Sequence, residues 1–162
     1  MNSDELARRL GEAEDLRAIA NLKAHYCHLL DTRRASEAGA LFTEDGSWDG
    51  GEMYGSHSGR VNVAAYFERV QAESLLFAMH CISNPFLELR GPDEAFGRWY
   101  LMMPCTFRGP EGDRAVWGSA VYEDVFVRRD GRWQVRQMTI TSQFWTPYER
   151  GWVEQPFVGV ND

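Results

Sequence analysis

The sequence predicts an α+β domain in which about three N-terminal helices precede a strongly curved antiparallel sheet. Apolar residues recur at helical spacing up to about residue 72, and from about residue 75 the pattern changes to strand-like runs. The breaks between these runs are short and carry turn residues, which is typical of antiparallel hairpins. No repeat, linker or low-complexity segment divides the chain, so we expect one domain over residues 1–162.

The first helix is expected over residues 5–31, where Ala, Leu, Arg and Glu dominate and no proline interrupts. At about 100° per residue its apolar positions form one stripe that must face a core. The members of this stripe are Leu16, Ile19, Ala20, Tyr26, Cys27 and Leu30. Shorter helices are expected over residues 35–42 and 61–72. Between them, the glycine-rich stretch 46–55 is interpreted as two short extended pieces joined by a turn.

Four strand-like runs make up a meander over residues 75–145. They cover residues 77–89, 95–107, 115–128 and 133–145. Within the first run, residues 77–83 are apolar on both alternating faces, so we expect this part to be covered on both sides. The stretch from residue 141 to residue 162 is rich in aromatic residues, and proline and glycine break its final segment, 146–162. We therefore expect it to lie over a pocket mouth or a subunit neighbour.

The 162 residues carry a formal net charge of −7, which excludes a generic binder of nucleic-acid phosphates. A chain of this length closes a core without disulfides or a structural metal. No apolar run approaches the roughly 18 residues that span a bilayer. Three widely spaced cysteines, Cys27, Cys81 and Cys105, favour buried thiols. With no signal-peptide pattern at the N-terminus, we expect a cytoplasmic protein without nucleic-acid or membrane partners.

Metal and nucleophile signatures are absent from the sequence. His25 and His28 stand three residues apart, but no third ligand accompanies them and no HExxH or paired CxxC motif occurs. There is no GxSxG motif and no phosphate-binding glycine loop. We therefore predict no metal and no cofactor, which leaves cofactor-free chemistry for an enzyme.

Two polar residues in apolar settings are the candidate catalytic groups. His80 lies within an apolar run, where an imidazole is either a satisfied core group or a working one. Asp31 ends the first helix, where the helix dipole disfavours a carboxylate, and its alternatives are exposure or pairing with Arg33 or Arg34. If the helix packs across the meander, Asp31 and His80 can form a pair in which the carboxylate orients the imidazole. Tyr26 would project into the same space and could donate a hydrogen bond to a developing oxyanion.

Lys23 lies near the middle of the same apolar stripe. A structural lysine whose ammonium group reaches water is the interpretation we favour over a catalytic one. On that interpretation the substitution Lys23→Met should be tolerated.

The aromatic content, with nine Phe, six Trp and six Tyr, exceeds what a small core obviously needs. Alternation alone does not decide which rings face a pocket and which fill the core or a subunit interface. The candidates for pocket walls are Trp48, Tyr54, Met79, Trp99, Trp117 and Trp145.

Several of these segments resemble the SnoaL-like proteins of the nuclear transport factor 2-like superfamily. The matching segments are residues 21–26, Leu30-Asp31, residues 40–46, His80 with Ser83-Asn84-Pro85, Tyr122-Glu123-Asp124 and residues 128–133. The resemblance implies a cone-shaped curved sheet wrapped over helices around a deep apolar cavity. It also implies that Asp31 and His80 correspond to the acid–base pair of the dehydratases and dehydrochlorinases, and Tyr26 to the tyrosine of the dehydratases.

The resulting hypothesis is a cofactor-independent lyase that carries out a dehydratase-like elimination on a small hydrophobic, cyclic or aromatic substrate. An isomerase or cyclase of the same fold is an alternative, although the paired carboxylates of the isomerase relatives are not evident. A non-catalytic module that binds a hydrophobic ligand is another. Either kind of protein would suit a homodimer or homotrimer.

Overall fold

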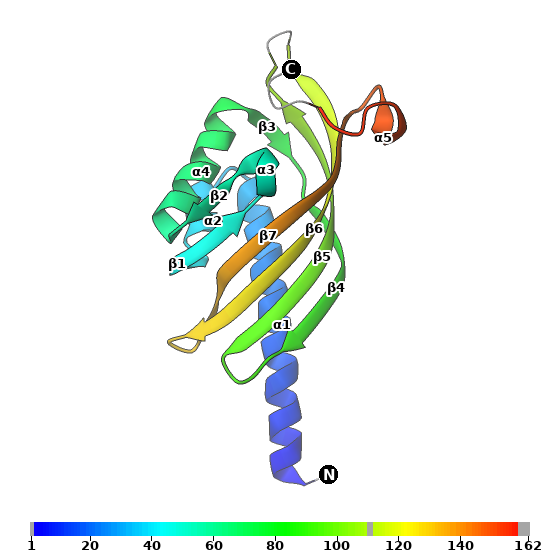
Figure 1. The fold of residues 1–162 in the computed structure, drawn as a ribbon. Helices are drawn as coiled ribbons and strands as arrows, with labels where there is room; N and C mark the ends of the chain where they lie inside the picture. Colours follow the sequence, from blue (N-terminus) through cyan, green and yellow to red (C-terminus); the bar gives the residue numbers. More distant parts are fainter. Residues whose placement is uncertain (1, 110–111, 159–162) are drawn as a thin grey trace.

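The computed structural model describes residues 2–109 and 112–158 (Figure 1). Its helices are α1 (Ser3–Asp31), α2 (Ala35–Gly39), α3 (Gly51–Tyr54), α4 (Arg60–Glu73) and α5 (Gly151–Glu154). Its strands are β1 (Phe42–Asp49), β2 (Ser56–Ser58), β3 (Leu75–Ala78), β4 (Cys81–Leu89), β5 (Glu94–Phe107), β6 (Arg114–Arg129) and β7 (Arg132–Pro147). The α+β class predicted from the sequence is confirmed.

The strands form one curled sheet in the order β2-β1-β7-β6-β5-β3, with β4 also paired to β5. Strands β5, β6 and β7 are antiparallel neighbours, as their short connections predict. However, β1 pairs with β7 in parallel, so the sheet is mixed and not wholly antiparallel as predicted. Helix α4 and the meander separate β1 from β7 in the sequence. Because no short turn joins these two strands, the sequence does not predict that they pair.

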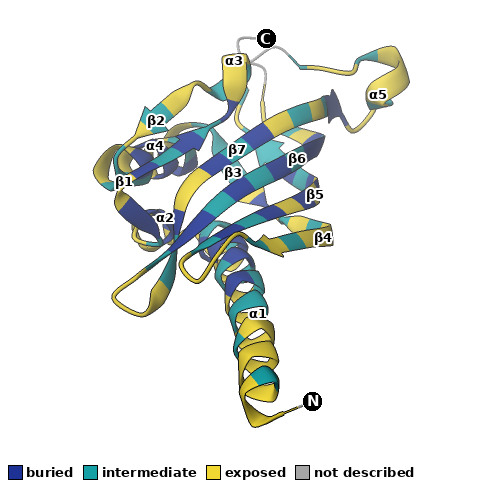
Figure 2. Ribbon diagram, turned by 60° about the horizontal axis from the view of Figure 1, so that its bottom comes forward, coloured by how far each residue is buried: buried dark blue, intermediate teal, exposed yellow. Residues whose placement is uncertain are grey.

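Helix α1 begins at Ser3, two residues before the expected start, and ends at Asp31 as expected. Its N-cap is Asn2, whose side-chain oxygen accepts a 2.8 Å hydrogen bond from the Glu5 N–H. The N-terminal half projects beyond the sheet and is largely exposed, whereas the C-terminal half packs into the fold (Figures 1 and 2). Within the described part of the chain, no helix is long and apolar enough to cross a membrane.

The expected strand over residues 77–89 is interrupted. The structure has β3 and β4 instead, and both pair antiparallel with β5. The interruption falls at Met79 and His80, so His80 stands in a break of the sheet edge and not within a strand.

The prediction that this run is covered on both sides is wrong. Phe77 is 52% exposed and Met79 is 47% exposed. Cys81 is exposed as well, although Cys27 and Cys105 are buried as predicted. Only the side of the sheet that faces the helices is buried here.

Lys23 is fully buried, which corrects the prediction that its ammonium reaches water. Its Nζ lies 2.8 Å from Oδ2 of Asp124, which is equally buried, and 3.4 Å from the ring centroid of Tyr122. A counter-ion on β6 therefore replaces water around the ammonium group. Asp124 lies far from Lys23 in the sequence, so the apolar pattern of the helix alone does not predict this pairing.

The C-terminal segment folds back along the end of β7. The Trp145 N–H donates to the Pro156 carbonyl at 2.8 Å, and the Val158 N–H donates to the Trp145 carbonyl at 2.7 Å. On the face of β7 opposite to Trp145, the Trp152 ring stacks on the Phe144 ring, with the ring centroids 5.0 Å apart. The rest of the segment predicted to cover a pocket, residues 159–162, lies outside the described residues.

Candidate active site

The curled sheet and its helices enclose a cavity of about 410 Å³, a size typical of small-molecule sites. Its wall is mainly apolar and aromatic, with a few polar groups. From the helices and their flanks come Tyr26, Leu30, Met53, Tyr54, Tyr66, Phe67, Arg69, Val70, Gln71, Glu73 and Ser74. The strands and the segments that follow them supply Trp48, Leu75, His80, Leu101, Met103, Phe107, Arg108, Gly109, Arg114, Val116, Tyr122, Ile140, Trp145 and Val158.

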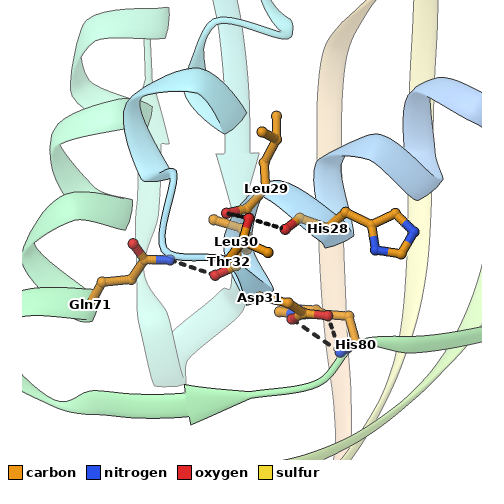
Figure 3. A network of polar contacts seen from close by, with 7 residues as sticks. All are labelled: His28, Leu29, Leu30, Asp31, Thr32, Gln71 and His80. Atoms are coloured by element: carbon orange, nitrogen blue, oxygen red, sulfur yellow. Dashed lines mark hydrogen bonds and ion pairs between the residues drawn. The ribbon is translucent and has the colours of Figure 1, made fainter.

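Asp31 and His80 are in direct contact at this cavity (Figure 3). His80 Nδ1 lies 2.5 Å from Asp31 Oδ1, a short distance that suits a charge-assisted hydrogen bond. The backbone N–H of His80 also donates to the same carboxylate, at 3.0 Å to Oδ2 and 3.2 Å to Oδ1. The side chain of His80 is 6% exposed and that of Asp31 is 19% exposed. Because Asp31 engages Nδ1, Nε2 is the nitrogen left for another molecule.

Several contacts hold the end of α1 against the strand break. Gln71, from α4, donates through Nε2 to the Leu30 carbonyl at 2.8 Å, next to Asp31 (Figure 3). Arg33, which follows the helix with a φ of 61°, donates to the Leu75 carbonyl at 3.0 Å and to the Gln71 carbonyl. These bonds join α1, α4 and β3, so the carboxylate has a fixed position relative to His80.

Tyr26 lines the same cavity from α1 and is 1% exposed. Its ring packs edge-on against Tyr122, with centroids 6.5 Å apart. Burial raises the pKa of both Tyr26 and Tyr122 well above the ordinary value of 10.0, so each keeps its phenolic proton and can donate it. The hydrogen bonds of His80 run to Asp31, whereas the hydroxyl of Tyr26 interacts with Tyr122 and Trp48.

Trp48 adds a second potential donor. It is 6% exposed, lies on the cavity wall, and packs on Tyr66 with ring centroids 4.9 Å apart. Its indole N–H is buried and interacts with the Tyr26 hydroxyl, where it offsets part of the rise in pKa that burial causes, without reaching the geometry of a full hydrogen bond. A bound oxygen or halogen atom would satisfy this donor.

The other histidines lie away from the pair. His25 and His28 are exposed on α1, and the His28 ring points away from Asp31 (Figure 3). His57 stacks on Tyr66 with centroids 3.9 Å apart. Among the described residues, no group of three or more His, Cys, Asp or Glu side chains is placed to hold a metal ion.

The model of the SnoaL-like domain family matches residues 11–139. The chain belongs to the SnoaL-like domain family. The match covers most of α1, all of α2, α3 and α4, most of the sheet and both members of the Asp31–His80 pair, so the family resemblance seen in short motifs is confirmed.

Solved structures with this fold accompany the family match. A hexachlorocyclohexane dehydrochlorinase (LinA type 2) superposes with a TM-score of 0.79 at 22% identity, over 86% of this chain and 92% of the other. A candidate scytalone dehydratase from Novosphingobium aromaticivorans has a TM-score of 0.73 at 23% identity, over 85% and 90% of the two chains. An NTF2-like protein with a cystatin-like fold from the same species has a TM-score of 0.72 at 20% identity, over 88% and 90%. At these identities the likeness establishes the NTF2-like fold.

The predicted wall residues of this SnoaL-like protein fall into two groups. Trp48, Tyr54 and Trp145 line the cavity. The prediction is corrected for the other three, which are not among its lining residues. Met79 points outward from the strand break, Trp117 lies on the outer face of β6 between the inward positions 116 and 118, and Trp99 is buried deeper, beside Lys23.

Gly118 gives Trp145 its place on the wall. The two residues are paired across β6 and β7, and a Cβ at Gly118 would come within 2.3 Å of the Trp145 ring. The indole N–H donates to Ser142 Oγ at 3.0 Å, which fixes the orientation of the ring. The absence of a side chain at Gly118 therefore lets the large ring lie close to the sheet.

The sequence prediction also missed residues that the structure brings to the cavity. Tyr122 is an inward position of β6, and strand alternation could have found it once the inner face was known. Arg69 and Arg108 line the cavity from α4 and from the end of β5. Neither arginine stands out in the sequence, since exposed arginines are common on helices and in turns.

Proposed function

We propose that this SnoaL-like protein is a cofactor-independent lyase that eliminates a small leaving group, in a dehydratase-like reaction, from a hydrophobic ring-containing substrate. The observation that carries the proposal is the 2.5 Å contact between Asp31 Oδ1 and His80 Nδ1 on the wall of a largely apolar cavity. A buried base next to apolar surface is a common arrangement for abstraction of a proton from carbon.

In the proposed reaction, Nε2 of neutral His80 takes a proton from a carbon atom of the substrate. The electron pair of that C–H bond forms the new double bond, and the leaving group departs from the adjacent carbon with its bonding electrons. Asp31 stabilises the imidazolium that forms and keeps its ring oriented. The phenol of Tyr26 and the indole N–H of Trp48, which both line the cavity, would donate hydrogen bonds to a carbonyl oxygen or to the leaving group.

The expected rate enhancements restrict the kind of C–H bond that the substrate can contain. A positioned general base contributes roughly 10² to 10⁴ in rate, and an oxyanion donor about 10² to 10³. Such contributions suit a C–H bond already activated by a neighbouring carbonyl or leaving group. Trp48, Tyr54 and Trp145 would pack against the ring of the substrate and exclude water.

The test begins with a substrate. Mass spectrometry of small molecules retained by the purified protein, followed by turnover assays on those compounds and their close analogues, identifies it. His80→Ala should then lower kcat by about 10³-fold, while thermal unfolding stays close to that of the wild type. The matched control is His25→Ala, an exposed histidine on α1. Wild-type turnover by folded His80→Ala would contradict the proposed mechanism, whereas no turnover of any retained compound by the wild type would favour a binding module.

We also propose that the chain assembles as a homodimer or homotrimer in the cytoplasm. The outer side of the sheet carries several exposed apolar residues, including Phe77, Phe86 and Tyr100, which supports contact with a second copy. Light scattering across a concentration series measures the assembly. A strict monomer at all concentrations would contradict this part of the proposal.

A further inference from the structure

We propose that the natural ligand of the cavity is an amphipathic anion, whose apolar ring body lies inside and whose anionic group is held at the mouth by Arg69 and Arg108. This inference rests on the proposed use of the cavity as the substrate site, and it specifies the class of substrate.

The exposure of the lining residues shows where the cavity opens to solvent. Three of the described lining residues are exposed, namely Arg69, Glu73 and Arg108. Arg69 and Glu73 belong to the last turns of α4, and Arg108 directly follows β5. The Arg108 N–H donates to the Ser74 carbonyl at 2.8 Å, which joins these two elements at the rim. The cavity therefore opens where α4 ends beside the β5–β6 hairpin.

Charge at this mouth is opposite to that of the chain. Among the described lining residues, Arg69 and Arg108 accompany one carboxylate, that of Glu73, and a third, half-buried arginine, Arg114, also lines the cavity. The whole chain, by contrast, carries a net charge of −7. An anion is therefore repelled by most of the molecule and attracted at the mouth.

Arg69 and Arg108 differ in their partners from the surface arginines that form ion pairs. Arg98, on the outer face of the sheet, contacts the Glu123 carboxylate at 2.6 Å. None of the ion pairs between described residues involves Arg69 or Arg108. The Arg69 guanidinium instead lies 5.7 Å from the centroid of the Tyr66 ring, another lining residue. A guanidinium without a carboxylate partner can form two parallel hydrogen bonds with a carboxylate, sulfonate or phosphate group.

The interior of the cavity determines the chemistry of the uncharged part of the ligand. Apart from the arginines and Glu73, the wall is mainly apolar and aromatic, with side chains such as Val70, Phe107 and Val116, and Asp31 and His80 are already paired with one another. A fully ionic ligand would lose its hydration there without compensation, whereas a ring body would gain from burial. The combination selects a molecule with one charged end.

A pair of fluorescent probes tests this inference directly. 1-Anilinonaphthalene-8-sulfonate and N-phenyl-1-naphthylamine share the same aromatic body, and only the first carries a sulfonate. We expect the sulfonate probe to bind the wild-type protein at least fivefold more tightly at low salt, with this advantage shrinking as the salt concentration rises. Because the test reads equilibrium binding alone, it does not depend on whether His80 is catalytic.

Substitutions then locate the charge effect. Arg69→Gln and Arg108→Gln should each weaken binding of the sulfonate probe by about fivefold, in line with an exposed ion pair, and leave binding of the uncharged probe unchanged. Arg98→Gln is the matched control, because it removes the same charge from the outer face. Equal affinity for both probes, or an equal loss in Arg98→Gln, would overturn the inference. So would a failure of the sulfonate probe to bind, whereas loss of turnover in His80→Ala bears only on the proposed lyase.

Discussion

Helix α1 supplies a charged residue to each of two buried pairs, and the pairs differ in what surrounds them. Asp31, at the end of the helix, contacts His80, which lines the cavity, and both side chains retain some exposure. Lys23, two turns earlier, contacts Asp124 at 2.8 Å, and both side chains are 0% exposed. In the proposed reaction the first pair exchanges a proton with a bound molecule, whereas the second pair is enclosed by protein.

The surroundings of the enclosed pair explain its role. Lys23 Nζ lies 3.4 Å from the centroid of the Tyr122 ring and 5.2 Å from those of Tyr26 and Trp99. Cation–π contacts of this kind offset part of the hydration that the ammonium loses. Burial alone therefore does not show whether a charged pair is catalytic or stabilising. The two pairs differ in access to the cavity, which only the Asp31–His80 pair has through His80.

Asp31→Asn should have the largest effect on turnover. The amide can still accept from the His80 backbone N–H, but it no longer stabilises an imidazolium, so we expect kcat to fall about 10³-fold. Steady-state kinetics together with thermal unfolding check this. A drop in kcat with nearly unchanged KM and melting temperature separates a positioning role from a loss of structure. Unchanged kcat in the folded variant would remove Asp31 from the mechanism.

Lys23→Met should destabilise the fold by about 3–5 kcal/mol, because it leaves the Asp124 carboxylate buried without a counter-ion. This reverses the expectation drawn from the sequence. The double variant Lys23→Met/Asp124→Leu should recover most of the loss, since a well-packed apolar pair often replaces a buried ion pair at little cost. Urea unfolding measures both. Equal stability of Lys23→Met and the wild type would show that the pair has no structural role.

Tyr26→Phe should slow turnover by about 10²-fold if the phenol donates to the substrate. The ring contacts with Phe42, Phe67 and Tyr122 are kept, so stability should change little. Tyr100→Phe, on the exposed outer face, is the control for a tyrosine outside the cavity. A Tyr26→Phe variant with wild-type kcat would leave the Trp48 N–H as the remaining candidate donor.

The enclosed pair should also give a smaller, pH-dependent signature. Burial raises the pKa of Asp124 from 3.8 to about 6, and Lys23 offsets part of that rise. Between these two values the folded protein binds a proton that the unfolded chain does not, so this group adds stability as the pH falls through about 6. The same contribution is lost as the pH rises again.

Unfolding measurements from pH 7 to pH 5 test this sign. Surface carboxylates with lowered pKa, such as Glu5 and Glu37, contribute in the opposite direction. The relevant quantity is therefore the unfolding free energy of the wild type minus that of the Lys23→Met/Asp124→Leu variant. We expect this difference to increase toward pH 5. A difference that stays flat or decreases would contradict the raised pKa.

The sequence predicted the elements whose signals are local. The helix that ends at Asp31, the meander and its turns follow from periodicity and turn residues within short windows. The pairing of Asp31 with His80 was a hypothesis, because it depends on how α1 crosses the sheet. The structure places the two side chains in contact, and their catalytic role stays a prediction.

The features that the sequence did not predict depend on distant partners. The counter-ion of Lys23 lies on β6, and the parallel neighbour of β1 is the last strand of the sheet. Trp99 and Trp117 look alike in sequence, yet one faces the core and the other the outer side of the sheet. Alternation predicts that neighbouring positions face opposite ways, but not which way is inward until the helices are placed.

Gly118 gives the molecule a simple means of changing its ligand. A methyl group at this position would displace the Trp145 ring, and the ring has cavity on its other side. Space for the ligand would shrink while Asp31 and His80, on α1 and at the far edge of the sheet, kept their places. Under the proposed function, ligand size and proton chemistry are set by separate residues, so a change in one codon would give a descendant of this protein a smaller substrate.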